Sequence, residues 1–450
     1  MACFQLNESR MMKINMTILA KIHSIAFVLL CVVLPCSPSV AEVPVWQPWV
    51  DASAFGYNAV DATTALQAAI NSGARTVYVP NMGTPWIVTP IFLASNQEII
   101  FESGVLIQAK AGSFIGQQDC LFKAEGKSNI TLTGYGARFR MRKEDYLSLP
   151  GEWRMGIWLR SCTNVNIRGM RIENTGGDGV YIGEIPESST PCQNITIKDV
   201  TCEDCARNAI SVVSVVNLLI DNCILRTTSG LAPMCGIDFE PNYNTDKIVN
   251  CIVRYSIIEG NVDHGIALPL QQLTDPSGQT SGSITNCTII SNGSLYNAYG
   301  IYLSHYLPNW TIRDNLIVNN YGYGMYQNMA GLQTTVTYTA FYGNIGGITY
   351  HVTRGTGCLT TVAPLFASAD ISSSDYMYLA KVNVPAILLS GASNGGYLGA
   401  RPMASDAQAC ANIWQFGKGM PADFNHDCVV NFLDVVMIAN DWLVSNNPTP

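Results

Sequence analysis

Charge is scarce in this chain of 450 residues: 13% of them are Asp, Glu, Lys or Arg, whereas 48% are hydrophobic. The net charge of −8 and the isoelectric point near 5.1 argue against binding to nucleic acid or to an anionic membrane surface. An acidic polysaccharide could therefore bind only at a local basic patch or through metal ions. Low charge combined with 38 glycines is typical of an all-β exported protein rather than a helical cytosolic one.

Long hydrophobic runs are also missing, since no stretch reaches the roughly 18 apolar residues of a membrane-spanning helix. The apolar run Ser24–Leu34 has 11 residues, follows Lys13 and Lys21, and precedes the small residues of Ser39–Ala41. This order is the pattern of a signal peptide. We therefore expect residues 1–41 to be a signal peptide and the mature protein to be secreted or held at the cell surface.

The cysteines lack the spacing of a metal site. Cys202 and Cys205 form one Cys-x-x-Cys pair, but neither a second such pair nor a histidine pair accompanies it. Other cysteines recur about once per repeat. An exported chain would permit disulfides, yet we interpret these residues as small apolar side chains inside the fold. They are Cys202, Cys223, Cys251 and Cys287.

One hydrophobic pattern occurs seven times in the middle of the chain. A glycine or alanine precedes residues that alternate between hydrophobic and other types, as in DGVYIG (178–183) and CGIDFE (235–240). Alternation with a period of two predicts β-strands. The small residue of each copy is Gly156, Gly179, Ala209, Gly236, Gly265, Gly300 or Gly324.

These copies recur every 23 to 35 residues, a spacing that predicts a β-solenoid. A β-propeller would need repeats of about 40–45 residues. We predict a right-handed parallel β-helix over residues 42–402, with the helix Thr63–Ser72 covering its N-terminal end. Residues 351–405 lose the repeat and are interpreted as the last coils, a cap and a linker.

Several segments carry a resemblance to a known group of proteins. The N-terminal segments are similar to the first coil of the pectate-lyase-like superfamily of right-handed parallel β-helix proteins, which includes polygalacturonase-like glycosidases. They read DASAFG (51–56), TALQAAI (64–70), TVYVP (76–80) and PIFLASN (90–96). The resemblance implies the β-helix fold and, more distantly, action on polysaccharides.

A narrower resemblance is to uncharacterised bacterial β-helix repeat proteins, which implies no particular activity. It is carried by residues 140–146, 152–154, 176–179 and 236–242. Of the polygalacturonase catalytic motifs, Asp178 matches a single aspartate and Asp263-His264-Gly265 matches the histidine motif loosely. The Asp-Asp pair and the Arg-Ile-Lys motif are missing.

Candidate site residues follow from the strand period, because positions i and i+2 project to the same side of a strand. Asp238 and Glu240 form a carboxylate pair about 7 Å apart along one strand. Paired carboxylates at about 5–9.5 Å hydrolyse glycosidic bonds. Neighbouring rungs add Asp178, Arg207 and His264 as further catalytic candidates.

Substrate-binding candidates lie in the same outward columns or on a less regular coil beside them. Aromatic side chains on a solvent face suit stacking against sugars, and arginine suits a cleft wall. The candidates are Trp153, Arg154, Trp158, Arg160, Tyr181 and Tyr302.

Three functions remain open at this stage. A glycoside hydrolase would use Asp238 and Glu240 as acid and base, together with Asp178. A polysaccharide lyase acting on uronic-acid glycans would use Arg207 or a lysine as base and would need a positive charge near the uronate. A non-catalytic glycan-binding protein would use the aromatic columns alone. Convergence of Asp178, Asp238 and Glu240 in one cleft would favour an enzyme.

Residues 403–450 predict a separate calcium-binding module. Oxygen-bearing side chains occupy loop positions 1, 3, 5, 9 and 12, and a backbone carbonyl at position 7 completes the set. The ligands are Asp423, Asn425, Asp427, Val429, Asn431 and Asp434. The segment resembles one dockerin repeat, which implies Ca²⁺ and a cohesin-like or cell-surface partner. Dockerins carry two such repeats and one is visible here, so either partner remains open.

Overall fold

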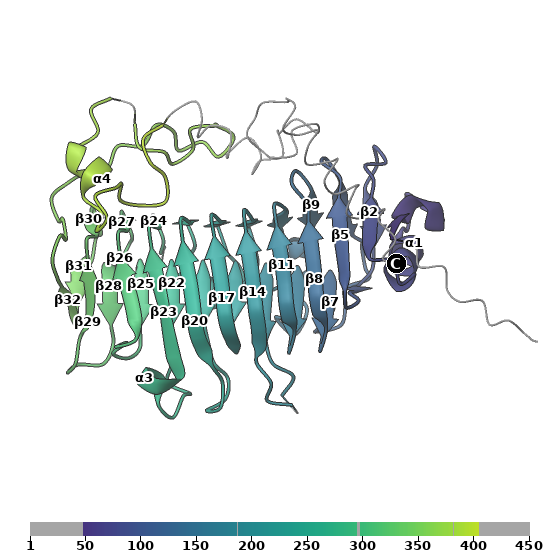
Figure 1. The fold of residues 1–450 in the computed structure, drawn as a ribbon, viewed down its shortest axis with the longest axis horizontal. Helices are drawn as coiled ribbons and strands as arrows, with labels where there is room; N and C mark the ends of the chain where they lie inside the picture. Colours follow the sequence, from purple (N-terminus) through teal and green to yellow (C-terminus); the bar gives the residue numbers. More distant parts are fainter. Residues whose placement is uncertain (1–47, 187, 295–297, 381, 405–450) are drawn as a thin grey trace, which may run out of the picture. The chain divides into compact units, whose positions relative to one another are not determined.

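The computed structural model describes residues 48–404, except 187, 295–297 and 381. The predicted signal peptide and the calcium ligands lie outside the described residues and stay predictions. Within the described part, strands from three parallel sheets alternate along the chain, as the ribbon in Figure 1 shows. This arrangement confirms the predicted β-solenoid.

Sheet A contains the longest strands, several of them with hydrophobic and polar residues in alternation. In spatial order it comprises β1 (Trp49–Asp51), β2 (Thr76–Val79), β5 (Gln97–Phe101), β8 (Ser128–Thr133), β11 (Thr163–Arg168), β14 (Cys192–Lys198), β17 (Val215–Asp221), β20 (Ile248–Arg254), β23 (Thr280–Thr285), β26 (Trp310–Arg313), β29 (Thr334–Thr337) and β32 (Val352–Arg354).

Sheet B follows sheet A in every full coil. It comprises β3 (Trp86–Val88), β6 (Leu106–Ala109), β9 (Arg138–Arg140), β12 (Arg171–Glu173), β15 (Thr201–Glu203), β18 (Ile224–Arg226), β21 (Ile257–Glu259), β24 (Thr288–Ile290), β27 (Leu316–Val318) and β30 (Ala340–Tyr342).

Sheet C holds the seven sequence repeats and completes each coil. It comprises β4 (Ile91–Phe92), β7 (Phe122–Glu125), β10 (Ile157–Arg160), β13 (Val180–Gly183), β16 (Ile210–Val212), β19 (Ile237–Phe239), β22 (Ile266–Leu268), β25 (Ile301–Leu303), β28 (Tyr323–Gln327) and β31 (Gly347–Tyr350).

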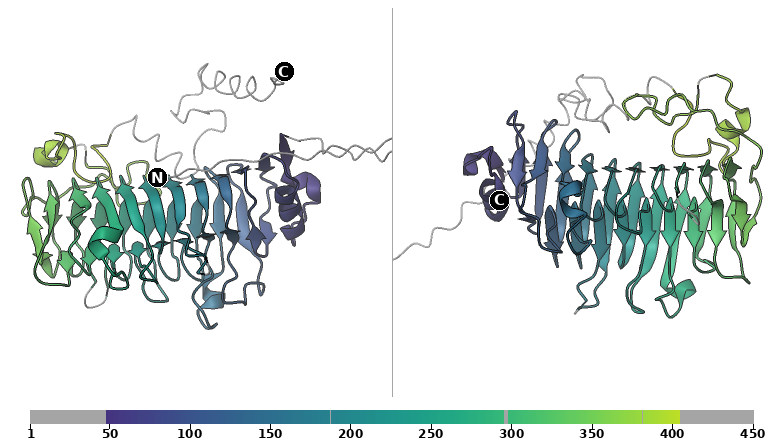
Figure 2. Two further views of the ribbon diagram at one scale, coloured as in Figure 1. Left: turned by 60° about the horizontal axis from the view of Figure 1, so that its bottom comes forward. Right: turned by 180° about the vertical axis from the view of Figure 1, so that it is seen from behind.

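Short corners join sheet A to sheet B. The first corner residue has a positive φ, for example 83° at Gly169, 56° at Asp199 and 54° at Asn222. Glycine, asparagine and aspartate tolerate this left-handed conformation best, so their recurrence marks the corners in the sequence. Figure 2 shows the resulting stack of strands from two further sides.

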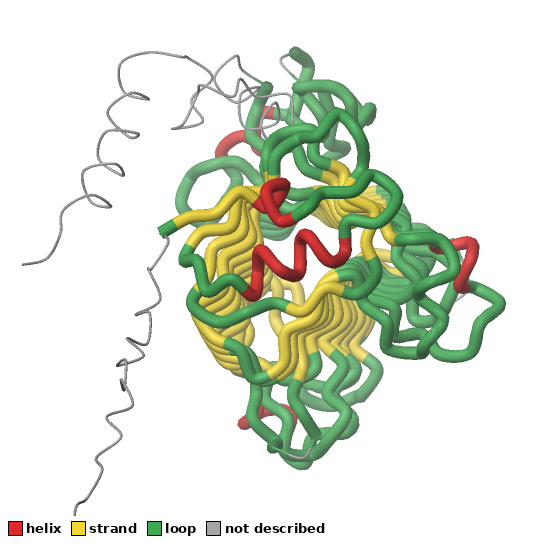
Figure 3. The backbone as a smooth tube through the Cα atoms, turned by 90° about the vertical axis from the view of Figure 1, so that its right-hand side faces the viewer, coloured by secondary structure: helices red, strands yellow, loops and turns green. Residues whose placement is uncertain are grey.

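Inward-facing Val, Ile, Leu and Phe side chains fill the coils, and the helix α1 (Thr63–Asn71) covers one end of them. The buried residues Leu66 and Ile70 of α1 join the same hydrophobic core as the strands. Figure 3 shows α1 lying across the ends of the stacked sheets, as the sequence predicted. The repeated cysteines, such as Cys202 and Cys223, are free and buried inside the coils, which confirms their interpretation as core residues.

Four shorter helices lie outside the coils of this part of the chain: η1 (Ala52–Phe55), α2 (Lys143–Tyr146), α3 (Pro276–Gln279) and α4 (Ala386–Ser390). Among the described residues, no helix is long and apolar enough to span a membrane.

Residues 355–359 continue the last coil, where Leu359 bridges Ala340 of β30, and residues 360–404 pack on sheet B. Tyr376 and Met377 contact the outward side chains Ile224 and Ile257 in one buried cluster. The sequence predicts last coils, a cap and a linker for this segment. Residues 360–404 instead form a layer over sheet B, because the outward-facing apolar residues of this sheet need to be covered.

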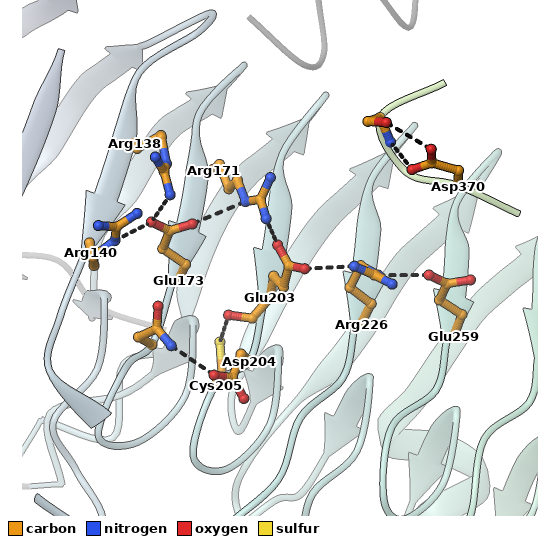
Figure 4. A network of polar contacts seen from close by, with 12 residues as sticks. Arg138, Arg140, Arg171, Glu173, Glu203, Asp204, Cys205, Arg226, Glu259 and Asp370 are labelled. Atoms are coloured by element: carbon orange, nitrogen blue, oxygen red, sulfur yellow. Dashed lines mark hydrogen bonds and ion pairs between the residues drawn. The ribbon is translucent and has the colours of Figure 1, made fainter. Parts of the chain in front are cut away.

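The rest of the outer face of sheet B carries a row of alternating charges, drawn in Figure 4. Glu173 accepts from Arg138 and Arg140, at 2.7 and 2.5 Å, and Arg226 bridges Glu203 and Glu259 at 2.6 Å each. The opposite charges alternate along the rungs and neutralise one another. We therefore interpret this row as a surface network of ion pairs rather than a binding site.

The seven small residues stack in register on sheet C, as predicted. The amide of Ile237 donates to the carbonyl of Gly265, and the amide of Ile266 donates to the carbonyl of Gly300, each at 3.0 Å. A Cβ atom added at Gly236 would lie 2.6 Å from the carbonyl oxygen of Gly265 and 2.3 Å from Ile258 Cγ2. The close stacking of coils therefore requires glycine at this position.

Gly236→Val should accordingly lower the free energy of unfolding by about 3 kcal/mol, the upper end for overpacked cores. Ala209→Gly is the matched control, because position 209 already holds a Cβ; it should cost only about 0.5–1 kcal/mol. Urea unfolding of both variants measures the difference. Equal losses in the two variants would contradict the close-contact explanation.

Candidate functional site

Arg207 is the centre of a charged cluster on the outer side of sheet C. It precedes β16, and its guanidinium makes two hydrogen bonds of 2.8 Å to the two carboxyl oxygens of Glu240, which follows β19. Arg207 Nη1 also lies 3.3 Å from both carboxyl oxygens of Asp178, which precedes β13. Side chains from the coil before and the coil after Arg207 thus converge on its guanidinium.

Asp178 is completely buried within this Arg207 cluster. One of its carboxyl oxygens accepts from the amide of Asn208 at 3.0 Å. Burial raises the pKa of Asp178 to about 6; the positive charge of Arg207 opposes this shift and the negative charge of Glu240 adds to it. Asp178 therefore changes its protonation state within the range where many enzymes work.

Asp238 lies on β19, two residues before Glu240, and is 2% exposed. Its Oδ1 has no hydrogen-bond partner among the described residues. Burial, followed by the negative charge of Glu240, raises the pKa of Asp238 well above its usual range. Burial thus favours the protonated form of Asp238, whereas Glu240 is ion-paired with Arg207.

The face that holds Asp238 was expected to be exposed to solvent, and it is not. Ser211, next to Asp238 in the rung register, is fully buried, and Arg207 Nη1 lies 3.4 Å from its Oγ. The long side chain of Arg207 lies over this part of the sheet. The alternation of residues along the strands does not predict that the Arg207 side chain extends across neighbouring coils.

Arg207 itself cannot be a proton acceptor. Burial alone would lower its pKa, but the negative charges of Asp178 and Glu240 outweigh burial and raise it. An arginine that stays protonated cannot serve as a catalytic base. This geometry therefore does not favour a lyase that uses Arg207 as its base.

A pocket of about 230 Å³ lies beside the Arg207 cluster on the same sheet. Its walls include the predicted substrate-binding residues Trp153, Trp158, Arg160 and Tyr181. Tyr181 connects the two features, because the charges of Glu240 and Asp178 both act on its hydroxyl group. The remaining lining residues are Gln118, Glu184, Pro186, Val213, Asn242 and Tyr243.

Trp158 lines this pocket. The ring of Tyr181 meets it edge-on at 6.0 Å, and Lys123 Nζ lies 4.1 Å from its ring centroid. Its indole Nε1 is buried and has no acceptor among the described residues. The Trp158 ring is 4% exposed, so it contributes an aromatic wall to the pocket, while its indole Nε1 is covered.

The comparisons with known proteins agree with this architecture. The model of the right-handed beta helix region matches residues 92–245 and 154–341, which together exceed half of the chain. This chain belongs to the right-handed β-helix family.

Two relatives of this β-helix protein come from Bacillus subtilis (strain 168). The protein YclG is 25% identical over 288 residues, covering 58% of this chain and 43% of YclG. The SPbeta prophage-derived protein YorA is 23% identical over 175 residues, covering 36% of this chain and 29% of YorA. The chain thus spans less than half of either relative, and neither name states an activity.

Among solved structures, the chain is similar to pectate lyase Pel9A. The match has 14% identity and a TM-score of 0.46, and it covers 69% of this chain and 87% of Pel9A. A match at this level does not bear on activity or substrate.

Two predicted residues of the β-helix lie in an aromatic stack rather than on Arg207. The ring of His264 is parallel to those of Tyr299 and Tyr302, at 5.2 and 4.9 Å. His264 Nδ1 accepts from the amide of Tyr299 at 2.9 Å, and burial lowers its pKa. His264 is therefore neutral, and the ring face of Tyr302 that contacts it is not available to a sugar.

Arg154 does not belong to the cleft wall. It is completely buried, and its guanidinium donates to the carbonyl oxygens of Phe114, Ile115, Pro150 and Gly151 at 2.9–3.1 Å. Four main-chain acceptors account for its hydrogen-bonding capacity. Its role is to fix the loops next to Trp153.

Glu184 was missed in the sequence, although it lines the pocket directly after β13. Its partner Asp246 comes from a loop two coils further along. The strand pattern gives no signal for either residue, because both lie outside the alternating segments.

The raised pKa of Asp178 has a consequence for stability. Below pH of about 4, Asp178 is protonated in both folded and unfolded chains, and its contribution to stability is fully present. Between the ordinary aspartate pKa of 3.8 and the raised pKa of about 6, the folded state binds the proton more tightly. Stability should fall as pH rises through this window, at up to about 1.4 kcal/mol per pH unit from this group.

Asp178→Asn should flatten this decline, because the amide cannot ionise. Urea unfolding of wild type and variant at several pH values between about 4 and 6 measures the difference. Parallel stability curves for the two proteins would show that Asp178 does not titrate in this range.

Proposed function

We propose that this protein is an exported polysaccharide-active enzyme, a glycoside hydrolase whose active site is the Arg207 cluster and its adjoining pocket. One observation carries the proposal: Asp238, whose pKa is raised by burial, lies on β19, and Glu240, which is ion-paired with Arg207, follows directly, next to an aromatic pocket. Glycoside hydrolysis requires an acid and a carboxylate at the same pH.

In this proposal Asp238 donates a proton to the leaving sugar oxygen, and Glu240 acts as the carboxylate partner. Arg207 fixes the orientation of Glu240 through two parallel hydrogen bonds. Trp158 and Tyr181 bind the sugar, with Trp153 and Arg160 at the rim of the pocket.

An extended substrate is supported by a second hollow on the same sheet. Its lining includes Phe92, Lys123 and Lys127. Phe92, Lys123 and Trp158 are neighbours in consecutive rungs of sheet C. Rungs repeat every 4.8 Å or so, a spacing close to one sugar unit, so a glycan chain can follow the column.

The test is a panel of neutral and acidic glycans assayed in parallel for reducing ends and for ultraviolet-absorbing unsaturated products. We expect reducing ends without unsaturated products. Unsaturated products would show a lyase. Binding to a glycan without any cleavage would instead support a glycan-binding surface protein.

The calcium module is proposed on its sequence alone. It would attach the enzyme to a cohesin-like or cell-surface partner. Calorimetric titration of the full chain should show uptake of one Ca²⁺ that Asp423→Asn abolishes, because an oxygen ligand with charge is lost. Equal uptake by wild type and variant would exclude this loop as the site.

A further inference from the structure

A second pair of acidic side chains forms one wall of the pocket. Glu184 is 4% exposed and lines the pocket together with Asn242 and Tyr243. Asp246 is completely buried in the loop 240–247, which carries Asn242 and Tyr243. The two carboxyls thus join the end of β13 to a loop two coils away.

The carboxyl of Asp246 acts on the Glu184 carboxyl through its negative charge and a side-chain contact. Two carboxylates in such a contact repel each other, so a proton on one of them stabilises the pair. Glu184 Oε1 and Asp246 Oδ1 are both buried, and neither has a hydrogen-bond donor among the described residues. A shared proton accounts for both of these oxygens.

The surroundings decide which carboxyl holds the proton. Asp246 Oδ2 accepts from the amides of Asn242 and Tyr243, at 2.8 Å each, and such donors stabilise a carboxylate. Burial raises the pKa of Glu184 to about 7, and the negative charge of Asp246 adds to the shift. Glu184 is therefore the protonated partner below about pH 7.

Other groups around Glu184 oppose this shift but do not replace the proton. The hydroxyl of Ser214 and the charge of Arg160 both lower the pKa of Glu184. The guanidinium of Arg160 donates at 2.9 Å to the main-chain carbonyl of Glu184. The charge of Asp246 also raises the pKa of Tyr181, which lies on β13 just before Glu184.

Asp246 also determines the shape of the loop 240–247. Its two bonds to the amides of Asn242 and Tyr243 close a turn, so the carboxylate fixes the two residues that face the pocket. A displacement of the Asp246 carboxylate would therefore also displace Asn242 and Tyr243, which form this wall. From the next coil, Gln279 donates to the carbonyl of Asn244 at 2.7 Å and supports the loop from the other side.

We propose that the proton shared by Glu184 and Asp246 is a latch that holds the loop 240–247 against the pocket, so that its loss opens the wall formed by Asn242 and Tyr243. Glu184 and Asp246 are positioning residues in this inference. It goes beyond the proposed function, because the latch would control the pocket whether the protein cleaves a glycan or only binds one.

The physical basis is the cost of a second charge. When Glu184 ionises, two carboxylates remain in contact in a buried site, and like charges repel strongly there. The loop can move away because it lies at the surface, whereas β13 is held between two neighbouring strands. Opening therefore begins in the loop.

Amide hydrogen exchange of the full chain tests the latch without a ligand. At about pH 8.5 the amides of residues 240–247 should exchange about tenfold faster in wild type than in Glu184→Gln, whose amide keeps donating to Asp246. At about pH 5.5 the two proteins should exchange alike. Comparison at equal pH removes the intrinsic pH dependence of exchange.

Two further variants make the result decisive. Asp246→Asn, which also removes the repulsion, should behave like Glu184→Gln at high pH. Glu125→Gln is the matched control, because Glu125 pairs with Arg160 at 3.3 Å but does not touch the loop, and it should behave like wild type. Equal exchange in wild type and Glu184→Gln at both pH values overturns the latch, as does calcium-dependent protection of the wild-type loop, which would indicate a cation between the carboxyls.

Discussion

Replacing Arg207 with methionine should lower the free energy of unfolding by about 3–5 kcal/mol, the range for a broken buried ion pair. Arg207 is 7% exposed and provides the positive charge for Asp178 and Glu240. Without it, two carboxylates would face each other in a buried cluster. Methionine fills a similar volume, so the loss would come from charge and hydrogen bonds rather than from a cavity.

Second-site changes separate these causes. Adding Asp178→Asn and Glu240→Gln to the Arg207→Met variant removes the uncompensated charges and should recover at least about 1 kcal/mol. Urea unfolding of the three proteins at neutral pH measures the recovery. A single Arg207→Met variant within 1 kcal/mol or so of wild type would show that the cluster is not held by its arginine.

Turnover should fall by about 10²-fold or more in both Asp238→Asn and Glu240→Gln, the scale of a lost general acid or base. Both substitutions keep the shape of the side chain. Asp238→Asn removes the proton donor, and Glu240→Gln removes the carboxylate that Arg207 holds in place. Initial rates of reducing-end release, with folding checked by circular dichroism, give the comparison.

Glu259→Gln is the matched control for these two variants. Glu259 belongs to the charged row on sheet B, where it pairs with Arg226 at 2.6 Å, and it should leave turnover unchanged. If Asp238→Asn and Glu240→Gln were both as active as this control, the reaction would take place elsewhere, and a glycan-binding role for sheet C would be favoured.

The strand period alone was sufficient to predict the fold and the columns of the candidate site. Trp158, Tyr181, Ser211 and Asp238 lie in consecutive rungs because one hydrophobic frame repeats and each coil must present it to the same interior. The helix over the N-terminal end was also predictable, since its apolar face matches the open coil.

Burial and partner choice could not be predicted in this way. Asp178 and Asp238 are buried because Arg207 reaches across two coils, and a long side chain has no fixed direction in a sequence pattern. His264 was expected near Asp238, but the tyrosines of the following coils provide closer stacking partners. Glu184 and Asp246 meet through a loop whose path depends on the tertiary fold.

The position of a bound glycan tests the central claim most directly. A crystal structure of Glu240→Gln with an oligosaccharide that wild type cleaves should show the chain along sheet C, with one sugar against Trp158 and Tyr181 and a glycosidic bond next to Asp238. An oligosaccharide bound on sheet A or sheet B, without contact to the Arg207 cluster, would contradict the assignment of the active site.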